Sequence, residues 1–231
     1  MNNGKFTLSG SALKLIAVVC MVIDHTAAFL LNGHEDVFFC VGGVEVTLVS
    51  LMRVVGRLAF PIFAFLLVEG FCHTRNKLRY ILQLFAFALI SELPFDLAAT
   101  GQLEYTWQNV FFSLALGAAG MWAVEYFGPG VFNRILAVTM IGCCAFCLRC
   151  DYSIGGFSCI MLIYILRQWG WVRLAAGCCV IPNTIISSLA CIPVYLYNGQ
   201  RGFVNNRFFK YFFYSFYPLH LLLIWLVREF L

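Results

Sequence analysis

Residues 52–71 read MRVVGRLAFPIFAFLLVEGF, a run that is apolar enough to cross a bilayer and yet carries Arg53, Arg57 and Glu69. About 20 apolar residues span the hydrocarbon core of a membrane as a helix. A charged side chain there costs roughly 2.5–3.5 kcal/mol on insertion, so it persists mainly where it pairs with another group or lines a polar cavity. The stretch therefore predicts a membrane helix that brings polar groups into the interior of a helix bundle.

The composition of the whole chain supports the same class. Hydrophobic residues make up 62% of the 231 residues and charged residues 11%, and the mean hydropathy is +0.87. A soluble globular domain has about 45–50% apolar and about 25% charged residues. We therefore expect an all-α fold, a polytopic transmembrane helix bundle of about eight spans in a single domain over residues 1–231.

Apolar runs separated by short polar segments give the expected positions of the spans. The predicted spans lie near residues 12–31, 47–71, 78–98, 109–127, 131–148, 154–168, 171–197 and 214–231. Pro182-Asn183 interrupts the seventh span, which we expect to be kinked or broken because proline removes a backbone donor. The segment before the first span is polar and has no small-residue cleavage site, so we expect this span to be retained.

Cysteine and charge patterns argue against two other classes of site. Most of the eleven cysteines lie in apolar runs, where cysteine behaves as a small hydrophobe. Four have the spacing of a metal cluster, but they lack a nearby histidine or a second knuckle, so we expect no metal: Cys143, Cys144, Cys147 and Cys150. The net charge of +4 includes no basic tract of the kind that nucleic acid requires.

The distribution of basic residues predicts the orientation. Lys5 and Lys14 precede the core of the first span and residues 73–79 are strongly basic, whereas residues 32–45 and 99–109 contain no Lys or Arg. Basic segments stay on the cytoplasmic side, so we expect a cytoplasmic N-terminus. In this topology Arg134, Arg167 and Arg173 also lie inside, and four basic residues lie outside: Arg149, Arg201, Arg207 and Lys210.

The predicted topology places polar residues that are distant in sequence at one depth, in the outer leaflet. The layer contains Asp24-His25, Arg53, Arg57, Glu92, Asp96, Gln108-Asn109, Asp151-Tyr152 and His220. A histidine held by a carboxylate acts as a general base, which favours Asp24-His25 as a catalytic pair. Adjacent helical residues point about 100° apart, however, so pairing of Asp24 with an arginine stays an alternative, as does a packing role.

The other polar residues also admit two interpretations. Arg53 and Arg57 are four apart and share a helix face, where they act as counter-ions or cradle a phosphate or a thioester-linked cofactor. The carboxylates Glu69, Glu92 and Asp96 either neutralise these arginines or belong to the site. His73 and Arg75 form either a topology signal or a polar site, and His220 either a site residue or part of an interfacial aromatic belt.

Six stretches resemble the TraX family of bacterial integral membrane proteins: 13–25, 52–71, HTRN at 73–76, SELPFD at 91–96, QNVFF at 108–112 and FYPLH at 216–220. The resemblance implies a membrane acyltransferase, since the founding activity of the family is N-terminal acetylation of conjugative pilin. It also implies acetyl-CoA as the donor, a pilin-like protein, peptide or glycan as the acceptor, and multi-pass residence in the bacterial cytoplasmic (inner) membrane.

By position, the resemblance makes His25 and the pair Arg53 and Arg57 central to the site. We expect His25 and Asp24 to be catalytic and Arg53 and Arg57 to bind the donor. Further polar site residues are expected to be Glu69, His73, Arg75, Glu92, Asp96, Asn109 and His220.

Two functions from other classes fit the same residues. A transporter or flippase of a small anionic solute would use the arginines as a binding site and the carboxylates as proton relays. A scaffold protein would use all of them as structural ion pairs. Transporters usually carry paired internal repeats, which this sequence lacks, and a scaffold gives no reason for a histidine in the polar layer. Acyl transfer is therefore the preferred hypothesis.

Overall fold

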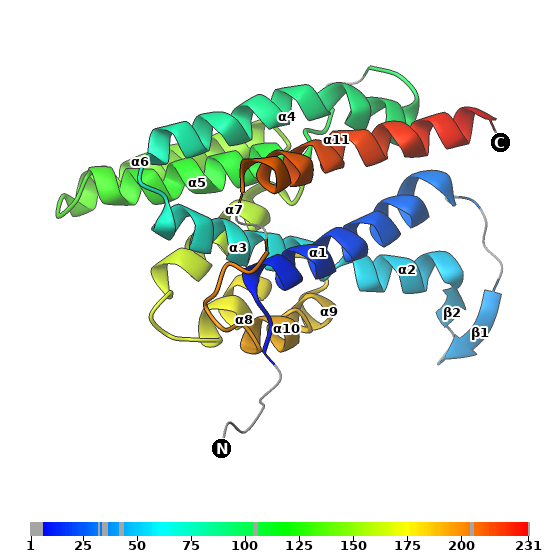
Figure 1. Cartoon of the computed structure of the whole chain (residues 1–231), viewed down its shortest axis with the longest axis horizontal. Helices are drawn as coiled ribbons and strands as arrows, with labels where there is room; N and C mark the ends of the chain where they lie inside the picture. The colour runs from blue at the N-terminus through cyan, green and yellow to red at the C-terminus, as the bar shows by residue number, and fades with distance from the viewer. Residues whose placement is uncertain are drawn as a thin grey trace.

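A computed structural model describes residues 7–31, 33, 37–41, 44–103, 106–203 and 206–230 of the chain. Lys5, which contributed to the predicted orientation, lies outside these residues. Helices dominate the structure (Figure 1). Among the described residues, four helical segments are long and apolar enough to cross a membrane: Gly10–Leu30, Leu48–His73, Lys77–Thr100 and Phe208–Phe230. The predicted all-α membrane bundle is confirmed.

The first predicted span is present with a change of helix type at its end. Helix α1 (Gly10–His25) is capped at its N-terminus by Ser9, whose side chain accepts a hydrogen bond from the amide of Ala12. It continues directly as the π-helical turn η1 (Thr26–Leu30). A π-turn adds a residue to the helical turn and is frequent at functional sites. Here it follows Asp24 and His25 immediately.

A small hairpin precedes the second span, where the sequence predicted only a loop. Strand β1 (Val37–Val41) pairs antiparallel with β2 (Val44–Thr47), with Val37 opposite Thr47. Thr47 then caps helix α2 (Leu48–Gly56) through a reciprocal bond pair with Ser50. The hairpin is an addition to the predicted all-α fold rather than a change of its class.

The span predicted at 47–71 is two helices, α2 and α3 (Ala59–His73), that meet at Arg57-Leu58. Pro61 explains the break, because a proline ring clashes with the carbonyl four residues earlier, which belongs to Arg57. Pro61 itself is tolerated because it lies in the first turn of α3, where an amide donor is not needed. The break places Arg57 between two helix ends inside the bundle.

The next four helices follow the predicted spans closely. They are α4 (Lys77–Thr100), α5 (Val110–Tyr126), α6 (Val131–Cys147) and α7 (Ser153–Ile165). Asn76 and Asn109 cap α4 and α5 through side-chain acceptors. Gly117 on α5 lies directly against the Ile160 side chain of α7, so a larger residue there would separate the helices.

The seventh predicted span, 171–197, is broken at Pro182-Asn183 as expected and is not a single helix. It consists of three short helices, α8 (Val172–Cys178), α9 (Thr184–Ser188) and α10 (Cys191–Tyr195). Gly177 packs on Cys159 and Val180 lies against Gly155, so α8 runs antiparallel to α7. Asn183, in the left-handed conformation, reverses the chain after Pro182. The chain therefore runs along the bundle in α8 and returns toward its starting end in α9 and α10.

The return of this segment changes the predicted topology of the C-terminal region. Leu196 accepts a hydrogen bond from the amide of Leu8, which brings the end of α10 beside the start of α1. Helix α11 (Arg207–Phe230) then starts seven residues before its predicted position. Arg201 and Lys210 line a cavity together with Lys14 and Arg75. The prediction that Arg201 and Lys210 lie on the side opposite Lys14 is therefore wrong.

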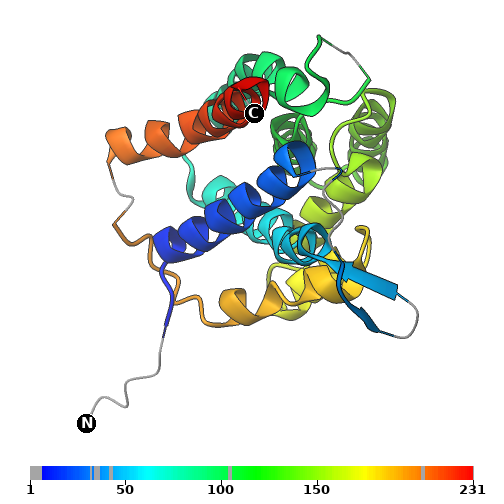
Figure 2. The same ribbon diagram turned by 90° about the vertical axis from the view of Figure 1, so that its right-hand side faces the viewer.

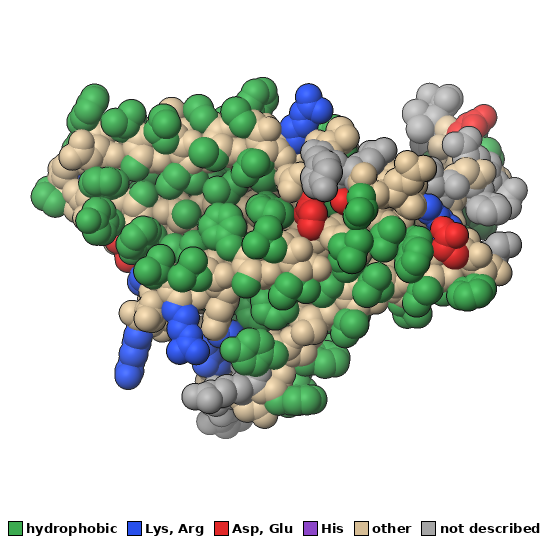
Figure 3. Space-filling view, turned by 90° about the horizontal axis from the view of Figure 1, so that it is seen from above, with side chains coloured by type: hydrophobic (Ala, Val, Ile, Leu, Met, Phe, Trp, Pro, Cys, Tyr) green, Lys and Arg blue, Asp and Glu red, His purple; other side chains and the backbone are tan. Residues whose placement is uncertain are grey.

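The arrangement of the helices leaves α1 in a central position. Figure 2 shows α1 between α11 on one side and the segments from α8 to α10 on the other. Apolar side chains from α1, α3, α5 and α7 form one continuous core, with Leu13, Phe65, Met121 and Ile160 almost fully buried. The surface in Figure 3 is mainly hydrophobic, with Lys and Arg gathered in patches, as expected of a face that contacts lipid.

The return of the chain through α8 to α10 can be tested by labelling. In a variant stripped of its native cysteines, we expect Thr74→Cys and Gln200→Cys to react with a membrane-impermeant maleimide from the same side. Thr100→Cys should react from the opposite side, because α4 separates it from Thr74. Labelling of Gln200→Cys together with Thr100→Cys would contradict the out-and-back path.

Candidate functional site

An ion pair connects the first two helices inside the bundle. The guanidinium Nη1 of Arg53 on α2 lies 2.6 Å from Oδ2 of Asp24 on α1. Their side chains are 33% and 17% exposed, so both are partly withdrawn from the surface. A Cβ at Gly56 would overlap the Asp24 side chain, so glycine is required for this approach. The prediction that Arg53 pairs with a carboxylate is confirmed, and that carboxylate is Asp24.

Arg57 serves a different set of groups. Its guanidinium interacts electrostatically with Tyr152, Asp24 and Asp151. Tyr152 also stacks on Phe60 of α3, with ring centroids 4.1 Å apart. The position of Arg57 at the break between α2 and α3 therefore lets it reach the turn between α6 and α7.

That turn has an unusual backbone. Positive φ angles occur at Arg149 (49°), Tyr152 (61°) and Ser153 (45°). Residues other than glycine rarely adopt this left-handed region. The turn is fixed by the amide of Asp151, which donates to Gln108 O at 2.9 Å, and by the hydroxyl of Ser113, which donates to Asp151 O. Strained backbone of this kind clusters at functional sites because the surroundings must hold it in place.

Asp151 was placed in the polar layer by the sequence but was not among the expected site residues. Burial, together with the nearby charge of Asp24, raises the pKa of its carboxyl to about 6, although Arg57 and Arg53 oppose the shift. Asp151 and Tyr152 therefore belong to the same cluster as Asp24, Arg53 and Arg57. Their depth in the predicted topology was the signal that could have identified them.

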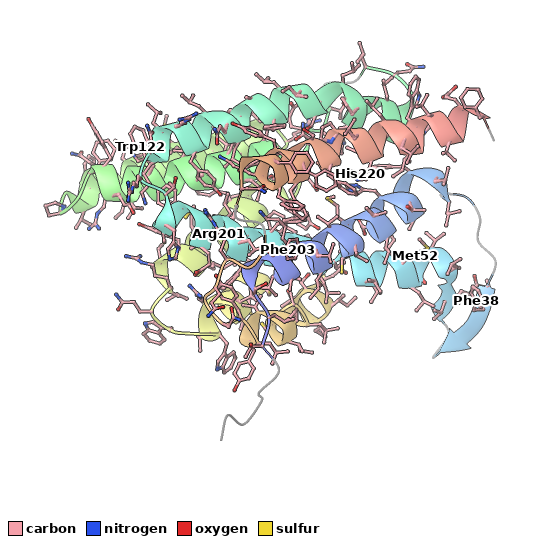
Figure 4. The ribbon with its side chains drawn as sticks, in the orientation of Figure 1. Phe38, Met52, Trp122, Arg201, Phe203 and His220 are labelled. Atoms are coloured by element: carbon pink, nitrogen blue, oxygen red, sulfur yellow. The ribbon has the colours of Figure 1, made fainter. Side chains whose placement is uncertain are left out.

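The clearest contact of the site joins two histidines that are 195 residues apart in sequence. Nδ1 of His25 lies 2.7 Å from Nε2 of His220, and the ring planes are 6° from parallel. Nδ1 of His220 lies 2.9 Å from the carbonyl oxygen of Phe216. His220 is 7% exposed, and Figure 4 shows it on the side of α11 that faces α1.

The hydrogen bonds assign the tautomers of both rings. A carbonyl oxygen only accepts, so Nδ1 of His220 donates to Phe216, and Nε2 of the neutral ring carries a lone pair. That lone pair accepts the proton on Nδ1 of His25. Nε2 of His25 is therefore left with a lone pair that is free to take a proton, which is the state of a general base.

Aromatic rings surround the histidine pair. The Tyr217 ring lies 5.9 Å from His25 and 5.5 Å from His220, and the Phe29 ring of η1 lies 5.4 Å from His25. Phe216 stacks on His220 at 5.4 Å. These contacts restrict the rotation of both imidazoles, so the geometry of the pair is maintained by packing as well as by hydrogen bonds.

Asn109 and Glu92 form a separate clamp between α4 and α5. Asn109 is fully buried, and its side-chain Nδ2 donates to Ala88 O at 2.8 Å and to Glu92 Oε2. Its side-chain Oδ1 accepts from the backbone amide of Phe111. All hydrogen-bonding atoms of this side chain are thus used. Glu92 therefore bonds to Asn109, not to an arginine, and Asp96 is also buried on α4.

The remaining expected residues lie at the other end of the bundle. Glu69 on α3 forms an ion pair with Arg173 on α8 at 3.1 Å, and its carbonyl oxygen bonds to Nδ1 of His73. Arg75 follows in the turn to α4. Glu69, His73 and Arg75 line a cavity of about 760 Å³ and are not part of the cluster around His25.

A small apolar pocket adjoins this cavity, and we refer to this pocket as the passage. It has a volume of about 120 Å³ and shares five lining residues with the cavity: Lys14, Leu66, Tyr80, Lys210 and Tyr214. Its other lining residues include Met21 and Tyr217. Neither histidine lines the passage, but Tyr217 contacts both His25 and His220, so one side chain separates the passage from the histidine pair.

Within the described parts of the chain, no three His, Cys, Asp or Glu side chains are grouped as metal ligands. The cysteines with cluster-like spacing do not gather either, since Cys143, Cys144 and Cys147 are exposed whereas Cys150 is buried.

These features define a class: a membrane helix bundle with an ion-paired, histidine-containing site in its interior. The sequence profile described as TraX protein matches residues 9–228, so the chain belongs to the TraX family. It is also 28% identical over 254 aligned positions to a probable fimbrial assembly protein FimC, serogroup H1, of Dichelobacter nodosus. The alignment covers 96% of this chain and 97% of that protein. No solved structure matches the chain significantly.

The pairing of Asp24 with Arg53 can be measured by a double-mutant cycle. We expect Asp24→Asn and Arg53→Gln each to lower the free energy of unfolding, measured by denaturant titration in micelles. The double substitution should cost less than the sum, with a coupling of about 0.5–3 kcal/mol.

The more exposed pair of Lys77 and Glu125, with 3.4 Å between Nζ and Oε1, provides a matched control. Its coupling should stay below about 1 kcal/mol, as is usual for surface pairs. Equal coupling for the two pairs would show that the Asp24–Arg53 contact has no special role in the bundle.

Proposed function

We propose that this protein is a membrane acyltransferase that moves an acetyl group from acetyl-CoA to an acceptor at the His25–His220 site. The observation that carries the proposal is the orientation of the two imidazoles, which leaves Nε2 of His25 as a free base. The apolar passage reaches Tyr217, which contacts both histidines, and this supports access of a substrate to the base. Membership in the TraX family supports the same reaction class.

The chemistry needs one base and one site for developing negative charge. The acceptor nitrogen or oxygen attacks the thioester carbonyl carbon while Nε2 of His25 removes its proton. The new bond to the acceptor forms, the carbon–sulfur bond breaks, and the proton passes to the leaving thiolate. The products are the acetylated acceptor and the free thiol of coenzyme A, so atoms and charge balance.

The residues around His25 take distinct roles in this proposal. His220 is a positioning residue, because it fixes the tautomer of His25 without contacting the substrate. Arg53 is neutralised by Asp24 and supports the fold of the site. Arg57 is the cation that we assign to the developing oxyanion, since a preorganised positive charge is worth most where water is excluded.

The acceptor is proposed from the relatives. The chain resembles over its whole length a protein named as a probable fimbrial assembly protein, which supports a pilin-related acceptor. An exported pilin-like protein would present its N-terminal amine at the outer half of the bilayer, at the predicted depth of His25. We therefore place the protein in the bacterial inner membrane with a cytoplasmic N-terminus, and we expect a peptide or glycan to be a less efficient acceptor.

The proposal is tested with purified protein in proteoliposomes, labelled acetyl-CoA and a synthetic peptide with a free N-terminus. We expect label transfer, and we expect His25→Ala to lower its rate by about 10²–10⁴-fold, the usual contribution of a general base. The exposed Gln102, which lines neither cavity, provides the control Gln102→Ala, for which we expect the wild-type rate.

His220→Asn distinguishes a positioning role from a packing role. Loss of the His220 ring removes the partner of His25 Nδ1. This loss should lower kcat and shift the pH–rate profile, because the tautomer of His25 is no longer fixed. A decrease in folded protein with an unchanged profile would contradict that role. Uptake of a small anion by the proteoliposomes without label transfer would instead favour transport over acyl transfer.

A further inference from the structure

The cavity at the opposite end from the histidines is strongly cationic. Lys14 of α1, Arg201 of the segment before α11, and Lys210 of α11 line it, and Arg201 and Lys210 both act electrostatically on Lys14. Figure 4 shows Arg201 near the start of α1. The single carboxylate among the described lining residues is Glu69, which already pairs with Arg173. Cations brought together without a carboxylate partner indicate an anionic ligand.

The partners of the two lysines are neutral. Lys14 lies 5.2 Å from the centre of the Phe213 ring, and Nζ of Lys210 donates to Gln83 Oε1 at 2.7 Å. Such contacts orient an ammonium group but do not neutralise it. Tyr80, Tyr197 and Tyr214 also line the cavity, and their rings offer flat apolar surfaces on which a nucleobase could stack.

The shape of the space suggests a ligand with a charged head and a narrow tail. The cavity of about 760 Å³ is within the usual range for small-molecule sites, roughly 300–1,000 Å³. The adjoining passage of about 120 Å³ is lined largely by apolar side chains, among them Val18, Leu67 and Leu114. Such an apolar lining favours an uncharged chain over a phosphate group.

The distance between the two ends is set by two helices. Lys14 and His25 are eleven residues apart on α1, which corresponds to about 16 Å along the helix axis. Lys210 and His220 are ten residues apart on α11, about 15 Å. A donor bound in the cavity therefore needs an extended arm to bring its reactive group to the histidines.

We propose that Lys14, Arg201 and Lys210 bind the phosphorylated nucleotide end of the donor, and that the apolar passage holds its uncharged arm. This inference rests on the proposed function for the identity of the donor. It assigns donor binding to three residues that were not expected from the sequence. Arg53 and Arg57, which were expected to bind the donor, lie instead beside Asp24 and Asp151.

Binding is tested separately from catalysis by titration calorimetry on the full chain in micelles. The probes are coenzyme A, adenosine 3′,5′-bisphosphate and pantetheine. We expect Arg201→Gln and Lys210→Gln each to weaken both phosphorylated probes at least about tenfold, as is typical when a charged hydrogen-bond donor is lost. The control Arg134→Gln, at a residue that does not line the cavity, should bind them like the wild type.

The passage is tested with Leu114→Trp, which places a bulky ring in its wall. This variant should still bind the bisphosphate, which also shows that it is folded, but it should bind coenzyme A more weakly and transfer no label. Full transfer by this variant would overturn the assignment of the passage.

The outcomes for the site and for the function are distinguishable. If Arg201→Gln and Lys210→Gln bind both phosphorylated probes as tightly as the wild type, the cavity assignment is wrong, even if acetyl transfer occurs. If these variants lose binding but wild-type protein transfers no acetyl group, the cavity assignment stands and the proposed function fails.

Discussion

A charge inside a bundle of apolar helices must pair with another group or line a polar cavity, and the site of this protein depends on that constraint. Asp24 and Arg53 satisfy it for each other across α1 and α2. Their approach requires the absence of a side chain at Gly56, and the helix break caused by Pro61 follows immediately. The break in turn places Arg57 beside Asp151 and Tyr152. One local pairing thus connects three segments that are far apart in the chain.

Helices α1 and α11 link the two ends of the molecule. Each contributes a lysine to the cationic cavity and a histidine to the pair, Lys14 and His25 on α1 and Lys210 and His220 on α11. The register of α1 relative to α11 therefore fixes the geometry of both the cationic cavity and the histidine pair. In the proposed reaction, this common register matches the length of the donor to the position of the base.

Much of the bundle could be predicted from hydropathy, because apolar length and polar breaks are local properties of the sequence. The convergence of Asp24, Arg53 and Asp151 followed from depth alone. The contact between His25 and His220 could not be predicted, since it depends on how α11 packs against α1. The interruption at Pro182-Asn183 was predicted, but the return of the chain through α8 to α10 was not, because the length of this segment suits one span. That error moved Arg201 and Lys210 to the wrong side and concealed the cationic cavity.

The central claim is that a donor enters at the cations and presents its thioester to His25. A cryo-electron microscopy structure of the protein in a nanodisc with bound coenzyme A tests it most directly. The account predicts the phosphates beside Lys14, Arg201 and Lys210, the arm in the passage, and the sulfur next to Nε2 of His25. Phosphate density beside Arg53 and Arg57, or a thiol that points away from the histidine pair, would contradict it.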